Sequence, residues 1–533
     1  MTILPLGKRT RRWIAALGLA ACGVSAAPAE PAADAVAVHV LNRLGYGPAP
    51  GELDHVRQIG VDRYIEEQLH PERMPLPASL QRQLDALGST RLSQRDLIEQ
   101  YRHAAQAARN DGEQGRAERR ALDQRIALES GQARLLRAIR SPRQLQEVMV
   151  EFWFNHFNVY RGKGLDRVLI ENYEREAIRP YAMGRFRDLL GATAHHPAML
   201  FYLDNWLSSA PGYQATRAGG PLAKANGLNE NYARELMELH TLGVDGGYTQ
   251  RDVTELARIL TGWTFDPRAR RVDAASASAF AFDARRHDPG DKAWLGQHVA
   301  ARAAAEGEWA LDVLAAHPAT AHHLAYELAQ AFVDDAPPPA LVDRLARRFL
   351  DTDGSIAAVL KTLFDSAEFR DPGARGAKFK TPYQYVVSSV RAADLPVANV
   401  RPLLATLTQL GMPLYGCQTP DGYHNTEQAW LNPDAMTRRI HFATALASGR
   451  LPLARPMDDA DVGAAADTAM SPDADNGAAA RLPAAWASAP VDVDAMLALL
   501  GPTLSARTRA AVAHAEPSLR AALVLGSPDF MHH

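Results

Sequence analysis

The sequence predicts a mainly α-helical, multi-helical globular fold with long loops and little β-structure. Apolar residues recur at helical spacing through most of the chain, and no long alternation of β-branched and polar residues is present. Hydrophobic residues make up 47% of the 533 residues, which is enough for a sizeable core. The net charge of −3 gives no basic footprint for nucleic acid, so we expect no nucleic-acid partner.

Residues 1–26 have the pattern of a secretory signal peptide, because basic residues precede a short apolar run and small residues follow it. Two cleavage sites compete. Residues 19–22 resemble a lipobox, which would leave Cys22 as the acylated first residue, whereas the small residues 24–26 form an ordinary site that would remove Cys22. We expect an exported protein, either periplasmic or an outer-membrane lipoprotein. Its only membrane attachment would be the lipid on Cys22.

Composition divides the mature chain into four parts. Residues 27–35 are rich in Ala and Pro and are expected to form a tether. Residues 36–450 form the main helical domain, which contains a charged helical hairpin near 96–140. Residues 455–482 are a low-complexity Asp/Ala/Pro insertion, and residues 483–533 are helical again and are expected to pack on the main domain.

The first helix of functional interest is predicted from the Ser141-Pro142 start to residue 160. Glu151 and Asn155 share a polar face of this helix, because they are four residues apart. His156 lies instead among apolar residues. It can be a core histidine with satisfied hydrogen bonds, or it can serve as a base or metal ligand.

A second polar group follows in the segment 195–206. His195 and His196 precede a proline that begins a helix, so we expect one of them to be a cap and the other a ligand. The segment ends on the polar pair Asp204 and Asn205.

The stretch 227–265 is the centre of the predicted fold and reads as two helices joined by a glycine turn. In the first helix, 230–241, one face carries the polar residues and the neighbouring face carries the core residues. The polar residues are Asn231, Arg234, Glu235 and Glu238, and the core residues are Tyr232, Leu236 and Leu239. Thr249 is expected to cap the second helix together with Asp252.

The remaining chain begins with an irregular segment, 266–309, in which His287 and Asp288 are candidate metal ligands. Helical periodicity returns at 308–349 and continues, with interruptions, to the end of the chain.

Several of these motifs resemble those of a bacterial exported family catalogued as domain of unknown function 1800. The matching segments are 153–157, 196–200, 202–205, 229–263, 287–288, 378–382 and 430–433. The resemblance covers the chain from about residue 36 onward and implies an exported, largely helical protein without an assigned substrate. It also implies a partner, since members are often encoded beside a second exported, sulfatase-like protein.

No standard catalytic motif is present, so the polar helix faces carry the functional hypothesis. We expect helices 142–160 and 230–241 to meet in one cleft, with Asp204 and Asn205 nearby. The catalytic candidates are Arg234, Glu235, Glu238 and His156, the binding candidates are Glu151, Asn155, Asp204, Asn205 and Asn231, and the metal candidates are His196, His287 and Asp288. Such a cleft would suit a hydrolytic or divalent-metal-dependent enzyme. The alternative is a non-catalytic envelope scaffold or binding protein whose polar cluster is a structural salt-bridge network.

Overall fold

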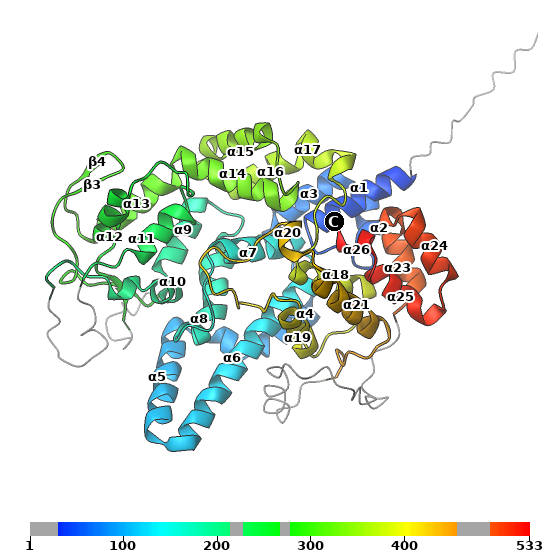
Figure 1. Ribbon diagram of the computed structural model, residues 1–533, viewed down its shortest axis with the longest axis horizontal. Helices are drawn as coiled ribbons and strands as arrows, with labels where there is room; N and C mark the ends of the chain where they lie inside the picture. Colours follow the sequence, from blue (N-terminus) through cyan, green and yellow to red (C-terminus); the bar gives the residue numbers. More distant parts are fainter. Residues whose placement is uncertain (1–29, 214–226, 267–277, 456–490) are drawn as a thin grey trace, which may run out of the picture.

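The computed structural model describes residues 30–213, 227–266, 278–455 and 491–533 (Figure 1). Helices make up nearly all regular structure in this part of the chain, and its four strands form two short antiparallel hairpins. The predicted fold class is therefore confirmed. The predicted signal peptide, Cys22 and nearly all of the 455–482 insertion lie outside the described residues. None of the described helices is long and apolar enough to cross a membrane.

The N-terminal helices begin earlier than predicted. Helix α1 starts at Glu30, so the tether expected over 27–35 is helical from that residue, in keeping with the high helix propensity of its alanines. Three helices follow: α2 (Glu52–Ile59), α3 (Val61–Leu69) and α4 (Ala78–Asp85).

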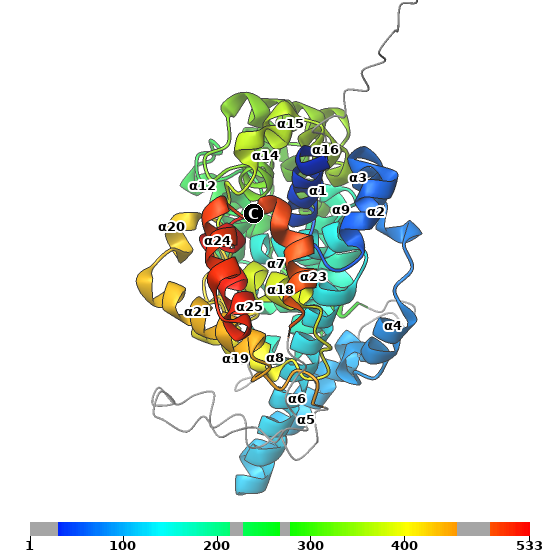
Figure 2. The ribbon, with the colours of Figure 1, turned by 90° about the vertical axis from the view of Figure 1, so that its right-hand side faces the viewer.

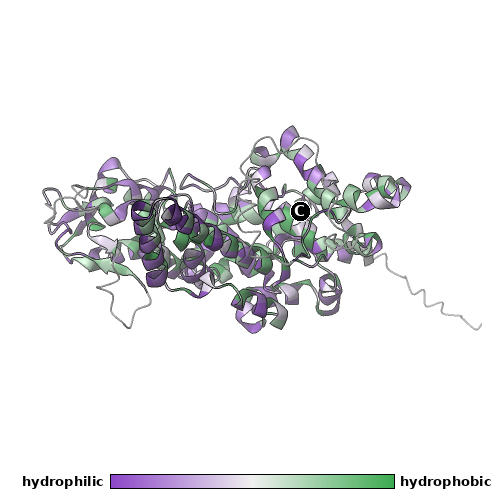
Figure 3. Cartoon of the chain, turned by 90° about the horizontal axis from the view of Figure 1, so that it is seen from below, coloured by the Kyte–Doolittle hydropathy of each residue, from purple (hydrophilic) through white to green (hydrophobic). Residues whose placement is uncertain are grey.

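The charged hairpin consists of α5 (Gln94–Asn110) and α6 (Gly112–Arg140), which project from the body of the molecule (Figures 1 and 2). Its tip is hydrophilic (Figure 3), whereas the last turns of α6 bury Leu135 and Leu136 in the core. The hairpin is thus fixed at its base, with a charged, solvated tip.

Helix α7 (Gln144–His156) runs through the middle of the molecule (Figure 1). It begins two residues later than the predicted 142–160, because α6 continues to Arg140 and residues 141–143 connect the two helices, and it ends four residues earlier, at His156. The Trp153 indole N–H donates to the Ala182 carbonyl (3.0 Å), which anchors α7 to the next part of the chain. That part contains α8 (Asp166–Tyr173), α9 (Phe186–His195) and α10 (Pro197–Tyr202).

The central stretch forms α11 (Asn231–Glu238) and α12 (Gln250–Ile259). The predicted capping box is present, since the Thr249 hydroxyl accepts from the Asp252 N–H and the Asp252 carboxylate accepts from the Thr249 N–H. Strands β1 (Trp263–Phe265) and β2 (Phe280–Phe282) pair next, followed by β3 (Lys292–Trp294) and β4 (Gln297–Val299).

The rest of the described chain is helical. They are α13 (Ala304–Ala315), α14 (Pro318–Phe332), α15 (Pro339–Asp351), α16 (Ile356–Phe364), α17 (Ala367–Arg370), α18 (Pro382–Ala393), α19 (Arg401–Gln409), α20 (Glu427–Trp430), α21 (Pro433–Ala447), α23 (Val493–Leu500), α24 (Ala506–His514), α25 (Pro517–Leu525) and α26 (Pro528–Met531). The last helices pack on α18 and α21, and a β-bridge between Phe379 and His532 brings the final residues beside α1 (Figure 1).

Candidate functional site

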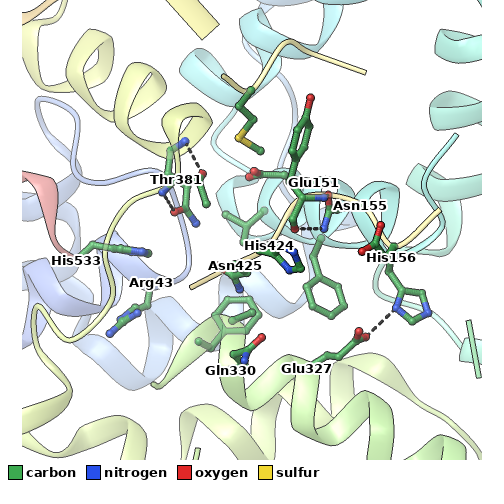
Figure 4. Close-up of a pocket in the computed structure, with 18 of the residues that line it drawn as sticks. Arg43, Glu151, Asn155, His156, Glu327, Gln330, Thr381, His424, Asn425 and His533 are labelled. Atoms are coloured by element: carbon green, nitrogen blue, oxygen red, sulfur yellow. Dashed lines mark hydrogen bonds and ion pairs between the residues drawn. The ribbon is translucent and has the colours of Figure 1, made fainter. Parts of the chain in front are cut away.

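A cavity of about 230 Å³ lies between α7, α14, the start of α18 and the loop 411–426 (Figure 4). The polar side chains that line it come from segments far apart in the sequence. They are Arg43, Glu151, Asn155, His156, His323, Glu327, Gln330, Thr381, Gln384, Asp421, Tyr423, His424, Asn425 and His533.

On one side of this cavity, His156, His323 and Glu327 form a cluster suited to a metal ion. One ligand atom of each residue lies within 4.8 Å of the other two, and no second group of this kind occurs in the described part of the chain. His156 Nδ1 lies 2.7 Å from Glu327 Oε2, and His323 Nε2 lies 3.6 Å from Glu327 Oε1. His156 is buried, whereas the other two side chains are partly open to the cavity.

Backbone carbonyls orient both imidazoles of this His156–Glu327–His323 cluster. His156 Nε2 lies 3.2 Å from the His240 carbonyl. His323 Nε2, the nitrogen nearest Glu327, also lies 3.2 Å from the Leu239 carbonyl, so an ion at this nitrogen would replace that hydrogen bond. Without an ion, the 2.7 Å contact between His156 Nδ1 and Glu327 Oε2 is a hydrogen bond that the imidazole donates, and a bound ion would take the place of that proton. Burial alone would raise the pKa of Glu327, but the neighbouring His156 and then His323 hold it below its usual value. The carboxylate is therefore ionised and able to act as a ligand.

The α14 members of the cluster were missed by the sequence analysis, although a local signal was present. His323 and Glu327 are four residues apart, so a helix places them on one face. Metal-binding helices place two ligands at this spacing, as the two histidines of the H-E-x-x-H motif do. The spacing alone does not say that α7 supplies the third side chain.

Glu151 lies in the same cavity, one helical turn before Asn155. It accepts a hydrogen bond from the Tyr46 hydroxyl (2.8 Å). Burial raises the pKa of Glu151 to about 6, while the charge of Arg134 and the Tyr46 hydrogen bond limit the rise. Glu151 also lines a void of about 30 Å³ behind the cavity, large enough for a water molecule. It can therefore exchange a proton near neutral pH.

Asn155 anchors the loop 411–426, which lines the cavity. Its Nδ2 donates to the Tyr423 carbonyl (2.9 Å), and its Oδ1 accepts from the Tyr423 N–H (2.7 Å). Gly422 allows this close approach, because its φ is +71° and a Cβ there would lie 2.4 Å from the Asn155 carbonyl oxygen. Asn155, which was predicted as a binding residue, thus lines the cavity and holds the loop in place.

We expect Gly422→Ala to lower the free energy of unfolding by about 2–4 kcal/mol, because a left-handed backbone and a backbone clash add together. Gly411→Ala is the matched control. Gly411 has φ +83° with nothing within 4 Å of its Cβ position, so it should show only the backbone cost of about 1–2 kcal/mol. Urea unfolding of both variants measures the difference, and equal losses would contradict a tight Asn155–loop contact.

Three of the predicted binding residues lie outside the cavity, where two of them satisfy backbone groups and the third forms an ion pair. Asn205 is fully buried and donates to the carbonyls of Leu260 and Trp263, at 3.3 and 3.1 Å. Asn231 donates to the Leu203 carbonyl (3.3 Å). Asp204 forms an ion pair with Lys163 (2.8 Å) at the surface.

The predicted catalytic residues of α11 also lie outside the cavity. Arg234 contacts Glu230 and Gln250, and Glu238 accepts from the Tyr248 hydroxyl. Glu235 is half-buried, and its pKa is raised by burial and then by the adjacent Glu238.

The prediction that the polar face of α11 shares a cleft with α7 is therefore wrong. The position at which α11 ends explains the difference. The helix ends at Glu238, three residues before the predicted end. The carbonyls of Leu239 and His240 are then available to orient the two histidines. The central stretch reaches the cavity through this backbone and the Leu239 side chain, rather than through its carboxylates.

The predicted metal ligands are also used elsewhere. His196 caps α10, because its Nδ1 accepts from the Ala198 N–H (3.1 Å), and its Nε2 bonds to Asn172 (2.9 Å). Burial, and then the charge of Arg175, lower the pKa of His196 to about 3. Both ring nitrogens are occupied, so His196 is the cap of the predicted pair and not the ligand.

His287 and Asp288 belong to a second buried network. His287 Nδ1 donates to the Thr261 carbonyl (2.9 Å), and its Nε2 lies 3.3 Å from Glu306. Glu306 forms an ion pair with the fully buried Lys292 (2.6 Å). Asp288 pairs with Arg258 (2.9 Å). These contacts correct the metal prediction for this loop, because they satisfy the same side chains without an ion.

Comparison with known proteins identifies the chain at the level of a family. A family profile described as a protein of unknown function, DUF1800, matches residues 39–532. No curated protein and no solved structure matches the chain. The match spans the cavity and nearly all of the described helices, and it agrees with the resemblance seen in the sequence motifs. The chain therefore belongs to the DUF1800 family of proteins of unknown function.

Proposed function

We propose that the protein is a divalent-metal-dependent enzyme of hydrolytic type. The observation that carries the proposal is the His156–Glu327–His323 cluster on the wall of a cavity. Two imidazoles and one carboxylate are a ligand set that binds Zn²⁺. Three protein ligands leave a coordination position for water or substrate, which distinguishes catalytic from structural sites.

The chain itself supplies the proton-transfer group and the orientation of the site. A bound divalent ion would lower the pKa of a water molecule. Glu151 is the proposed proton acceptor, because it lines the cavity and its pKa of about 6 suits transfer near neutral pH. The His240 carbonyl holds the His156 imidazole, and Asn155 holds the loop that lines the cavity.

The proposal places this enzyme outside the cytoplasm. The pattern of residues 1–26 supports export, and Cys22 would attach the protein to the outer membrane if it is acylated. The resemblance to the family also suggests an exported, sulfatase-like protein encoded nearby as a partner. Membrane fractionation of cells that express wild type and Cys22→Ala tests the anchor, since only an acylated chain should move to the soluble fraction on substitution.

The second candidate function is a non-catalytic envelope scaffold, and a specific observation favours it. A buried ion pair also occurs away from this cavity, between Lys292 and Glu306, where it has a structural role. His156 and Glu327 would then form one more structural ion pair, and the cavity would catalyse no reaction.

Metal titration separates the two functions. We expect metal-stripped wild-type protein to bind one Zn²⁺ or Mn²⁺ per chain in calorimetry, and the protein as purified to contain that ion in elemental analysis. Stoichiometric binding that is lost in Glu327→Gln supports the enzyme. No binding of any divalent ion by a folded wild-type chain would exclude the metal-dependent function and leave the scaffold.

A further inference from the structure

We propose that the end of the cavity opposite the His156–Glu327–His323 cluster is an anion-binding subsite, in which Arg43 and His533 bind a carboxylate or phosphate group of the substrate. Arg43 and His533 lie together on one side of the cavity, and His156 and Glu327 lie on the other (Figure 4). The inference rests on the proposed function, because it assigns a substrate class to the same cavity.

Arg43 is a buried guanidinium with incomplete hydrogen bonding. It is the last residue of α1, and only 2% of it is exposed. Its Nη2 donates to the carbonyls of Ala374 (2.8 Å) and Val333 (3.3 Å), whereas Nε and Nη1 have no partner. Burial lowers the pKa of Arg43 to about 9, so it stays charged at neutral pH. An unsatisfied buried donor destabilises the protein, and more so when it is charged, and a bound anion would offset this cost.

His533 presents a second unsatisfied nitrogen beside Arg43. Its Nδ1 donates to the Asn42 carbonyl (3.1 Å), and its buried Nε2 has no partner. In this tautomer Nε2 carries a lone pair when the ring is neutral. An anion would therefore bind together with a proton, which converts Nε2 into a donor.

The charges around His533 favour an anion at this position. Burial places the pKa of His533 well below its ordinary value, and the cations Arg43, Lys380 and Lys378 lower it further. Lys378 is paired with Asp335, whereas the Lys380 ammonium lies over the Phe530 ring at 3.9 Å. The negative charges of Asp334 and Asp335 raise the pKa of Arg43 and so help to keep it protonated. Burial, and then the charge of Arg439, lower the pKa of Lys380 to about 7, so protonation of this amine near neutral pH would strengthen the attraction for an anion.

The two ends of the cavity together define the substrate class. One end would hold a divalent ion and the bond to be hydrolysed, and the other would hold a negative oxygen. The cavity volume of about 230 Å³ admits only a small molecule or one end of a chain. The substrate would therefore carry a carboxylate or phosphate at one terminus.

The test measures anion binding to the full-length, metal-stripped chain by calorimetry, with inorganic phosphate and acetate as separate probes. We expect wild type to bind at least one probe, and the responding probe identifies the group. Arg43→Gln and His533→Gln should each weaken binding at least tenfold. Arg63→Gln, at a solvent-exposed arginine on α3, is the matched control and should not change it.

Proton uptake gives an independent measurement for acetate, which stays ionised across the range tested. We expect wild type to bind acetate, if that is the responding probe, at least threefold more tightly at pH 6 than at pH 8, because His533 must be protonated in the complex. His533→Gln should lose most of this dependence, and the part that remains reports the protonation of Lys380, whose pKa burial lowers to about 7. If phosphate is the probe that binds, proton uptake is measured instead of the pH comparison. The observed binding enthalpy is then compared between buffers of different ionisation enthalpy.

The outcomes separate this inference from the proposed function. Anion binding that is lost in the variants supports the subsite even if no divalent ion binds, in which case the metal-dependent function alone fails. No response of folded wild type to either probe, or unchanged affinity in both variants, would overturn the subsite. If Arg43→Gln does not fold, which circular dichroism shows, His533→Gln decides the question.

Discussion

Replacing His323 with alanine is expected to lower the affinity for Zn²⁺ at least about a hundredfold, which corresponds to about 2.7 kcal/mol of binding free energy. His323 supplies one of the three ligand atoms of the cluster. Loss of a residue that only orients a ligand already costs about 10–100-fold in metal affinity, so loss of a ligand should cost more. The side chain is about one quarter exposed, and therefore the fold should tolerate the truncation. Competition with a chelator measures the affinities of wild type and variant.

The adjacent residue provides the control for this substitution. His322 also lies on α14 but points to solvent, with 60% of its side chain exposed and a distant contact to Asp343. His322→Ala should keep wild-type affinity. Zn²⁺ at a hundred times its dissociation constant should also stabilise wild type and His322→Ala by about 2.7 kcal/mol, but not His323→Ala. Equal metal affinity in the two variants would show that the ion, if one binds, is held elsewhere.

The local features of the fold could be predicted from the sequence because they depend on neighbouring residues. The capping box of Thr249 and Asp252 involves side chains three positions apart, and the structure contains it. The polar face of Glu151 and Asn155 follows from helical geometry, and both residues line the cavity. Helix ends were less predictable, since tertiary contacts of Leu239 and His240 end α11 early.

The set of residues that form the site could not be predicted, because it depends on which segments, distant in the sequence, come together in the fold. His156 and Glu327 are 171 positions apart, and no local pattern relates them. Asn205 illustrates the opposite error. A polar side chain on an apolar segment must find partners, but those partners can be backbone carbonyls as readily as a ligand. His196 and Asp288 also bind other groups of the protein, so a polar residue at a core position does not by itself predict a ligand site.

The largest stability effect is expected at Glu174, which lies at the centre of a buried charge network. Its carboxylate accepts from Arg134 (2.8 Å), Arg179 (2.9 Å) and the Tyr415 hydroxyl (2.8 Å). Glu174→Gln should lower the free energy of unfolding by about 3–5 kcal/mol, since it leaves Arg134 buried without its charged partner. Glu113→Gln is the matched control, because Glu113 also contacts two arginines but is fully exposed, and its substitution should have little effect.

The pH dependence of stability identifies the charge of Glu174 as the cause. Burial would raise its pKa, but Arg134 and Arg179 outweigh burial and lower the pKa from 4.5 to about 2. Because the folded state depresses this pKa, the stabilisation is fully present above pH 4.5 and is lost as the pH falls toward 2. In this window Glu174→Gln should reduce the slope of stability against pH by up to about 1.4 kcal/mol per unit, for a total of about 3 kcal/mol. Urea unfolding of wild type and variant between pH 3 and 7 measures the two slopes. Parallel curves would mean that Glu174 contributes packing and hydrogen bonds to the network but no net charge interaction.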